Sequence, residues 1–336
     1  MKYFTAAFLL IMIALCAVLF FLPDKIRKAA QTSEEASVRE VVVTTYPIWL
    51  LTRELMDGTG RTPQLLTPPD AGCPHDYTLT TTDLLKISGK PILLFANGAG
   101  LDDHLCQAAL SANKDIDVVD TSEEIERILT EGDDDVDHEA EHDHHDGDDD
   151  HEGDHEGHHH HHHGGKNGHF FASPFQAFAI IDTIYSALVQ NDPLNVEIYE
   201  KNVTMLEQML RLLQIEYQSN LSPYTGTRVA AQHDIFDYLL LDIGFEKPIS
   251  IFADPETPPS PAEITKLTQE FKEQGVKVIF TEPQYPDDLA KLIGKETGAT
   301  VVKIDSLASG PANPPPLYYY NVMRNNISLM KKALAE

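Results

Sequence analysis

Two kinds of hydrophobic pattern alternate along most of the chain. Short apolar runs rich in β-branched residues, such as residues 41–45, are typical of strands that are buried on both faces of a sheet. Longer stretches with apolar residues at helical spacing separate them. The strand-like runs are 41–45, 64–66, 91–96, 117–119, 228–231, 249–252, 276–281 and 300–304. The alternation predicts two α/β halves, each with a parallel sheet that helices cover on both faces.

The helical pattern is found between these runs in both halves. Helices are predicted at 47–56, 81–87, 102–110, 122–129, 235–242, 261–274, 287–297 and 318–334. The start at Pro261 is the best defined, because Ser260 and Glu263 have the spacing of a capping box and proline suits the first helical position.

A pair of helical stretches, 173–189 and 193–221, separates the two halves. Asn191-Asp192-Pro193 ends the first stretch and starts the second. At 1.5 Å per residue the second stretch would extend roughly 43 Å. We interpret it as a stiff strut that joins two lobes, the alternative being a surface helix on one domain.

The N-terminus predicts export. Lys2 is followed by an apolar run from Phe4 to Leu22, which Pro23 and several charged residues end. A positive start and an apolar run are typical of an export signal, and this run is long enough for one membrane span. We therefore expect a periplasmic or extracytoplasmic protein, with an uncleaved or late-cleaved segment that could anchor it to the inner membrane.

The formal net charge of −28 is concentrated in one tract. Residues 131–156 hold fifteen acidic residues and no basic ones, and removing them leaves −13. The acidic body argues against a nucleic-acid partner, which needs a basic face. Twelve of the sixteen histidines lie between His138 and His163. We expect residues 133–168 to be a disordered loop that binds metal loosely, as an accessory to a better-defined site; the alternative is a merely solvating acidic loop.

Four histidines lie outside the tract, and three of them, His75, His169 and His233, occur where strands or linkers end. Ligands of parallel α/β sheets gather at the carboxyl ends of strands, so these three imidazoles are candidates for one metal site. Among the three cysteines, Cys73 and Cys106 could form a disulfide or remain separate thiols. Cys73 is two residues from His75, so it could also be a metal ligand. The sequence favours this role less than a disulfide or a separate thiol.

Short motifs along residues 41–334 resemble one family, the cluster A-I solute-binding proteins of zinc and manganese ABC importers, especially the zinc-uptake members. The matching pieces are VTTYP at 43–47, PHDY at 74–77, NGAGL at 97–101, Asp192-Pro193 with Tyr199 and Asn202, His233-Asp234 with Phe236 and Tyr238, FTEPQ at 280–284 and IDSL at 304–307. A His-rich insertion just before the second histidine also fits. Their order and spacing together are specific, whereas each piece alone is weak.

The resemblance implies two α/β lobes that a long rigid helix joins, with the metal in the cleft between them. It also implies the metal ligands, which are His75, His169, His233 and Asp305. The implied cargo is Zn²⁺, with Mn²⁺ a less favoured alternative, and the implied partner is an ABC transporter permease. We expect a monomer that is not an enzyme. The corresponding division is a signal or anchor segment and tether (1–39), an N-terminal lobe (40–132), the His/Asp/Glu-rich loop (133–168), the end of the N-terminal lobe (169–192), a linker helix (193–222) and a C-terminal lobe (223–336).

Several departures from the family pattern affect this ligand set. Asn167-Gly168 replaces the usual Asp-Pro before His169, which makes His169 the least certain ligand. Phe171 stands in place of Trp, and Asp102 and His104 stand where Glu and Trp are common. His104 or Glu282 could replace a ligand.

The donor types favour zinc. Three imidazoles and a carboxylate suit four-coordinate Zn²⁺, whereas Mn²⁺ prefers more oxygen ligands. Manganese-type members commonly have Glu where this chain has His233. Acceptors that orient the imidazoles should lie nearby, and Asp76, Asp234 and Glu282 are the candidates. Two other functions remain open, a membrane-tethered metal buffer or sensor and, with less support, a zinc hydrolase.

Overall fold

The computed structural model describes residues 38–130, 165–252 and 259–336, and the residues from Val41 onward form one compact unit. The predicted signal or anchor segment and most of the histidine tract lie outside the described residues. Among the helices that are described, none is both long and apolar enough to cross a membrane.

The first lobe is built on a four-stranded sheet whose order is β2-β1-β3-β4. Its strands are β1 (Glu40–Val43), β2 (Gln64–Leu65), β3 (Ile92–Ala96) and β4 (Ile116–Asp120). β1 runs parallel to β2, with Val42 opposite Gln64, and β3 runs parallel to β4, with Leu94 opposite Val118. β3 is buried throughout, as its continuous apolar sequence predicts.

The second lobe repeats this arrangement with the order β6-β5-β7-β8. Its strands are β5 (Val229–Ala231), β6 (Ile249–Ser250), β7 (Val278–Thr281) and β8 (Thr300–Lys303). All three pairs are parallel, and Ala230 lies opposite both Ile249 and Ile279. The predicted fold class, two parallel-sheet lobes, is confirmed.

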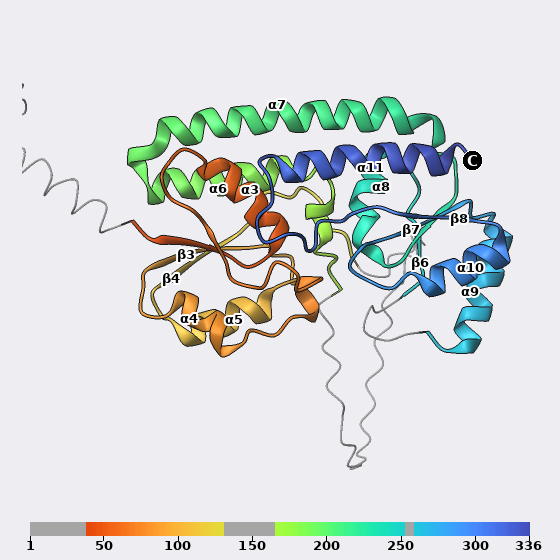
Figure 1. Cartoon of the computed structure of the whole chain (residues 1–336), viewed down its shortest axis with the longest axis horizontal. Helices are drawn as coiled ribbons and strands as arrows, with labels where there is room; N and C mark the ends of the chain where they lie inside the picture. The colour runs from red at the N-terminus through yellow and green to blue at the C-terminus, as the bar shows by residue number, and fades with distance from the viewer. Residues whose placement is uncertain (1–37, 131–164, 253–258) are drawn as a thin grey trace, which may run out of the picture. The chain divides into compact units, whose positions relative to one another are not determined.

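Helices flank both sheets (Figure 1). They are α3 (Tyr46–Met56), α4 (Thr81–Ile87), α5 (Asp103–Ala112), α6 (Ala177–Asn191), α7 (Val196–Leu221), α8 (Asp237–Ile243), α9 (Pro261–Gln274), α10 (Asp288–Thr297) and α11 (Tyr318–Leu334). The predicted capping box of α9 is present, because Ser260 Oγ accepts from the Glu263 N–H and Glu263 accepts from the Ser260 N–H.

Helix α7 joins the lobes, as the strut interpretation predicts. It follows a single 3₁₀ turn, η3 (Pro193–Asn195), and runs along one side of both lobes (Figure 1). Asn202 Nδ2 donates to the carbonyl of Leu55 at the end of α3, and Tyr217 donates to the carbonyl of Met323 in α11. Since the same 26-residue helix is bonded to both lobes, the alternative of a helix on one domain is excluded.

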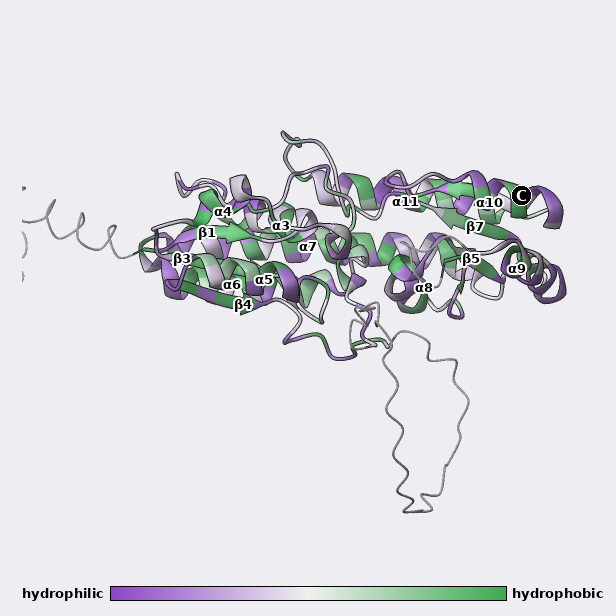
Figure 2. Ribbon diagram, turned by 90° about the horizontal axis from the view of Figure 1, so that it is seen from below, coloured by the Kyte–Doolittle hydropathy of each residue, from purple (hydrophilic) through white to green (hydrophobic). Residues whose placement is uncertain are grey.

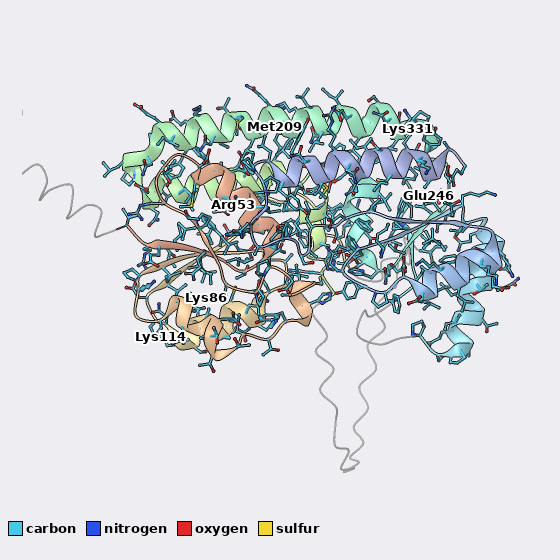
Figure 3. All side chains as sticks on the ribbon, in the orientation of Figure 1. Arg53, Lys86, Lys114, Met209, Glu246 and Lys331 are labelled. Carbon is cyan, nitrogen blue, oxygen red and sulfur yellow. The ribbon has the colours of Figure 1, made fainter. Side chains whose placement is uncertain are left out.

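The apolar residues concentrate on the strands and on the inner faces of the helices (Figure 2). A large core cluster runs through α3, α6, α7, α8 and α11, and a smaller one lies against each sheet. Charged side chains such as Lys114, Glu246 and Lys331 lie on the outside (Figure 3). The two lobes therefore share a core on the side where α7 runs.

The helix predicted at 122–129 is wrong. Ser122 donates to the Asp120 side chain through both its backbone N–H and its hydroxyl, which produces a turn at the end of β4. Further along, the Leu129 N–H donates to the hydroxyl of Tyr238, and the Leu129 carbonyl accepts from Asn167. The backbone groups of Leu129 thus bond to distant residues instead of within a helix.

Candidate metal centre

The structure brings His75, His169 and His233 together. His75 lies in the 3₁₀ turn η1 (Pro74–Asp76), His169 begins η2 (His169–Ala172), and His233 lies between β5 and η5 (Asp234–Phe236). The ring centroids are 5.3 Å apart for His169 and His233, 5.6 Å for His75 and His169, and 6.5 Å for His75 and His233. Two of the imidazoles come from the first lobe and one from the second.

Cys73 is the fourth member of this group. The donor atoms of Cys73, His75, His169 and His233 all lie within 4.8 Å of one another. The Cys73 Sγ is 3.2 Å from His169 Nε2, and the side chain is fully buried. No bond joins Cys73 to Cys106, both of which lie in the described part of the chain.

Asp305 is not one of the four donors that meet within 4.8 Å in the described chain. It follows β8, and its Oδ1 accepts hydrogen bonds from the Leu307 N–H at 2.9 Å and from Gln284 Nε2 at 3.2 Å. Burial raises the pKa of its carboxyl, an effect that these hydrogen bonds oppose. The Oδ1 of Asp305 thus stabilises the turn after β8.

Glu282 orients His233. Its Oε1 is 2.7 Å from His233 Nδ1, and its Oε2 accepts a 2.8 Å hydrogen bond from Ser306. Glu282 is fully buried at the end of β7. An imidazole that donates from Nδ1 to a carboxylate keeps its Nε2 lone pair for a metal, and the carboxylate increases its basicity. Glu282 therefore acts on the site through His233.

Replacing Glu282 with Ala should weaken zinc binding by about 10- to 100-fold, the usual effect of losing such a partner. Glu282→Gln keeps an acceptor oxygen and should lose less. Competition with a calibrated chelator measures both affinities. Asp287→Asn, at a partly buried carboxylate paired with Lys291, is the matched control. Equal affinities for Glu282→Ala and the unaltered protein would contradict an orienting role.

Asn167 and Asp234 orient His169. The Nδ1 of His169 is 3.0 Å from Asn167 Oδ1 and 3.2 Å from Asp234 Oδ1. Asn167 Oδ1 also accepts from the His169 N–H, and Asn167 Nδ2 donates to the Asp234 carbonyl. Asn167 thus links the two lobes and fixes the ring at once. We missed this role, although an Asn two residues before a His could have indicated it.

The charges of neighbouring groups and burial shift the pKa values of His169 and Asp234 in opposite directions. Burial lowers the pKa of His169, and Asp234 opposes that shift. Burial alone would raise the pKa of Asp234, but His169, His233 and His75 lower it to about 2. Asp234 therefore stays ionised at neutral pH and supplies negative charge behind the imidazoles.

The packing around Gly168 explains why Asn167-Gly168 stands before His169 in place of the family's usual Asp-Pro. A Cβ at this position would lie 2.6 Å from the Cβ of Leu101, so only glycine allows the two segments to approach this closely. Asn97 Nδ2 donates to the Gly168 carbonyl and holds the approach. Asp102 in turn accepts from the N–H groups of Asn97 and Gly98. The loop 97–101 is thus the support on which His169 rests.

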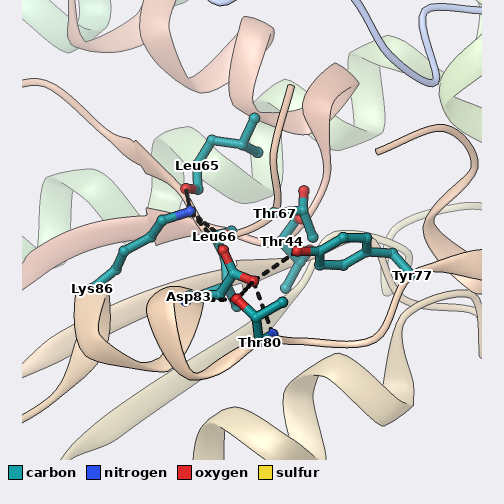
Figure 4. A network of polar contacts seen from close by, with 8 residues as sticks. All are labelled: Thr44, Leu65, Leu66, Thr67, Tyr77, Thr80, Asp83 and Lys86. Atoms are coloured by element: carbon teal, nitrogen blue, oxygen red, sulfur yellow. Dashed lines mark hydrogen bonds and ion pairs between the residues drawn. The ribbon is translucent and has the colours of Figure 1, made fainter. Parts of the chain in front are cut away.

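The segment after His75 is fixed by the network in Figure 4. Tyr77 donates to Asp83 at 2.7 Å, and Asp83 and Thr80 form the capping box of α4. Burial opposes ionisation of Asp83, but hydrogen bonds from Thr80, Tyr77 and Lys86 lower its pKa to about 2. His104 Nε2 is 2.8 Å from the Tyr77 carbonyl. His104 therefore holds this loop and does not join the four donors.

A cavity of about 330 Å³ reaches the site from the second lobe. Its lining includes His233 and the residues around it: Gln232, Phe252, Tyr285, Pro286, Asp288 and Leu289. The His233 side chain thus borders this cavity, although it is itself buried.

Two parallel-sheet lobes, a long helix that joins them and imidazoles that both lobes contribute define the class as a metal-binding solute-binding protein. The chain belongs to the family described as zinc-uptake complex component A, periplasmic (ZnuA), whose model matches residues 41–333. The family is that of a component of an uptake complex and not of an enzyme, and its periplasmic location fits the predicted export.

Relatives agree with this membership, and solved structures share the fold. The high-affinity zinc uptake system protein ZnuA of Bacillus subtilis is 27% identical over 97% of both chains. The zinc-binding lipoprotein AdcA of Streptococcus pneumoniae is 26% identical over 96% of this chain, which spans 60% of that relative. The solute-binding protein FpvC of Pseudomonas aeruginosa with Ni²⁺ has a TM-score of 0.71 at 22% identity, over 89% of this chain and 97% of FpvC. FpvC is also known with Mn²⁺, so the fold alone does not set the metal.

Proposed function

We propose that this chain is the extracytoplasmic zinc-binding component of an ABC importer, which captures Zn²⁺ between its lobes and delivers it to the membrane permease. The observation that carries the proposal is the convergence of three imidazoles from three separate loops, two of them with an acceptor on the opposite ring nitrogen. The zinc-uptake names of the family and of the relative from B. subtilis support it.

The donor set favours zinc as the cargo. His75, His169 and His233 offer imidazole nitrogens, which suit Zn²⁺ better than Mn²⁺, the ion that prefers oxygen ligands. Asp305, which we expected as the fourth ligand, already accepts hydrogen bonds from Gln284 and the Leu307 N–H on its Oδ1, so an ion at that oxygen would compete with these two donors.

Two further segments receive roles in this proposal. Residues 1–39 direct export and tether the protein, and the histidine tract at 133–168 collects zinc loosely and passes it to the site between the lobes. A tethered metal buffer is the second candidate function, and the twelve histidines of the tract favour it.

Removing residues 133–165 distinguishes these two functions. The shortened chain should keep one tight zinc in a chelator competition and should still support zinc uptake in cells that lack their own zinc-binding component. Uptake should fall only at limiting zinc, because collection by the tract is lost. If the shortened chain bound no zinc tightly, the tract would be the principal site and the buffer function would replace transport.

A further inference from the structure

The fourth donor of the cluster is a thiol where the sequence led us to expect a carboxylate. Cys73 and His75 are two residues apart at the start of η1, with the Cys73 backbone extended at φ −68° and ψ 138°. Both side chains reach the same point between the lobes, where His169 and His233 also arrive. Cys73 is thus part of the cluster itself and not of its surroundings.

We propose that Cys73 supplies the fourth metal ligand, so that the site holds its cargo through three nitrogens and one sulfur and selects zinc against manganese. This inference rests on the proposed function, because it concerns the same site. It replaces Asp305 by Cys73 in the ligand set and assigns the metal selectivity to one residue.

The distances fit a four-coordinate ion. In a tetrahedral zinc site with bonds of about 2.0–2.1 Å to nitrogen and 2.3 Å to sulfur, neighbouring donors are roughly 3.3–3.6 Å apart. In the structure the Cys73 Sγ is 3.2 Å from His169 Nε2, and no donor pair exceeds 4.8 Å. An ion among these donors would therefore need only small side-chain movements to bind all four.

The surroundings of the two described cysteines are different. Cys106, in α5, packs against an apolar cluster that includes Ile87 and Leu94. Burial raises the pKa of the Cys106 thiol, which is typical of an inert structural cysteine. Cys73 instead faces imidazoles. This contrast makes Cys106 a matched control for Cys73.

Sulfur changes the selectivity of the site. On binding, the thiol proton leaves to water and the thiolate neutralises one of the two charges of the ion. Thiolate ligands suit zinc and other soft or borderline ions, whereas manganese prefers carboxylate and water oxygens. A ligand set with Asp305 in place of Cys73 would discriminate less between the two ions.

Cobalt provides a direct readout, because a thiolate bound to Co²⁺ gives a charge-transfer band in the near ultraviolet. We expect the full chain with less than one equivalent of Co²⁺ to show this band. Cys73→Ser should lose it, and Cys106→Ala should keep it. The histidine tract contains no cysteine, so cobalt bound there cannot produce the band. A band that persists in Cys73→Ser would overturn the proposal.

Metal competition tests the selectivity. Cys73→Ser should bind zinc about a hundredfold more weakly, the order expected when one of four donors is lost from a zinc site. Cys73→Asp should bind manganese more tightly than the unaltered protein does. Asp305→Asn should leave zinc affinity within a few-fold. An unchanged ratio of zinc to manganese affinity in Cys73→Asp would contradict a selective role.

The two proposals fail in different ways. Loss of zinc in His75→Ala together with full zinc affinity in Cys73→Ser would reject only the sulfur ligand. Retention of tight zinc in both variants would reject the site itself. Thermal unfolding of each metal-free variant, compared with Cys106→Ala, shows whether the folded structure is intact.

Discussion

A double variant, His75→Ala with His233→Ala, should lose the tight zinc altogether. Two of four donors are removed, and structural zinc sites bind with about 10–16 kcal/mol in total, so the affinity should fall by at least about ten-thousandfold. A chelator competition under identical buffer conditions measures the loss. The remaining pair, His169 and Cys73, offers too few donors to hold the ion against the chelator.

The matched control replaces two histidines of the tract, His158→Ala with His163→Ala, and should keep the tight zinc. The fold should persist in the site variant, because His75 lies in the single turn η1 and His233 lies between β5 and η5, so neither substitution interrupts an α-helix or a strand. Circular dichroism of the metal-free protein checks this. A double variant that still held one tight zinc would place the site elsewhere in the chain.

Acid should release the zinc. A metal needs neutral imidazole, so each histidine that takes up a proton lowers the apparent affinity by about tenfold per pH unit below its pKa. Burial lowers the pKa of His169, as do His233 and His75, so proton competition at this ring begins below the ordinary value of about 6.5. His169 should therefore remain available to zinc at a pH where an imidazole of ordinary pKa is already protonated.

The metal-free protein should also lose stability in acid. Because the folded pKa of His169 is lowered, the unfolded chain binds protons more readily, and the free energy of unfolding falls as the pH drops below about 6.5. The low pKa of Asp234 adds stability that is present above 3.8 and is lost as the pH falls to about 2. Zinc titrations and thermal unfolding at stepwise lower pH measure both effects. A zinc affinity that did not change between neutral pH and pH 5 would contradict a site made of imidazoles.

The sequence patterns that predicted the fold correctly are those that depend on residues close together in the chain. The continuous apolar run at 92–96 must be buried on both faces, and Ser260, Pro261 and Glu263 can cap only one helix start. The prediction of a helix at 122–129 failed at its end because the partners of the Leu129 backbone groups, Tyr238 and Asn167, are far away in the sequence. Such tertiary hydrogen bonds leave no periodic signal.

The candidate site also has features that the sequence predicted and features that depend on tertiary contacts. Loop positions at strand ends indicated that His75, His169 and His233 would meet, and they do. The ligand role of Asp305 came from the resemblance alone, which could not reveal that the Leu307 N–H and Gln284 donate to its Oδ1. The proximity of the Cys73 thiol to the imidazoles could not be predicted, because the course of the chain from 73 to 75 decides which way the thiol faces.

The donors of this site come from chain segments that are far apart in the sequence and from both lobes. A bound ion is therefore a reversible cross-link, and anything that binds only the folded form raises its resistance to unfolding. The loaded protein should outlast the empty one wherever proteases remove unfolded chains. We therefore expect the zinc available outside the cytoplasm to affect how long the protein that binds it survives.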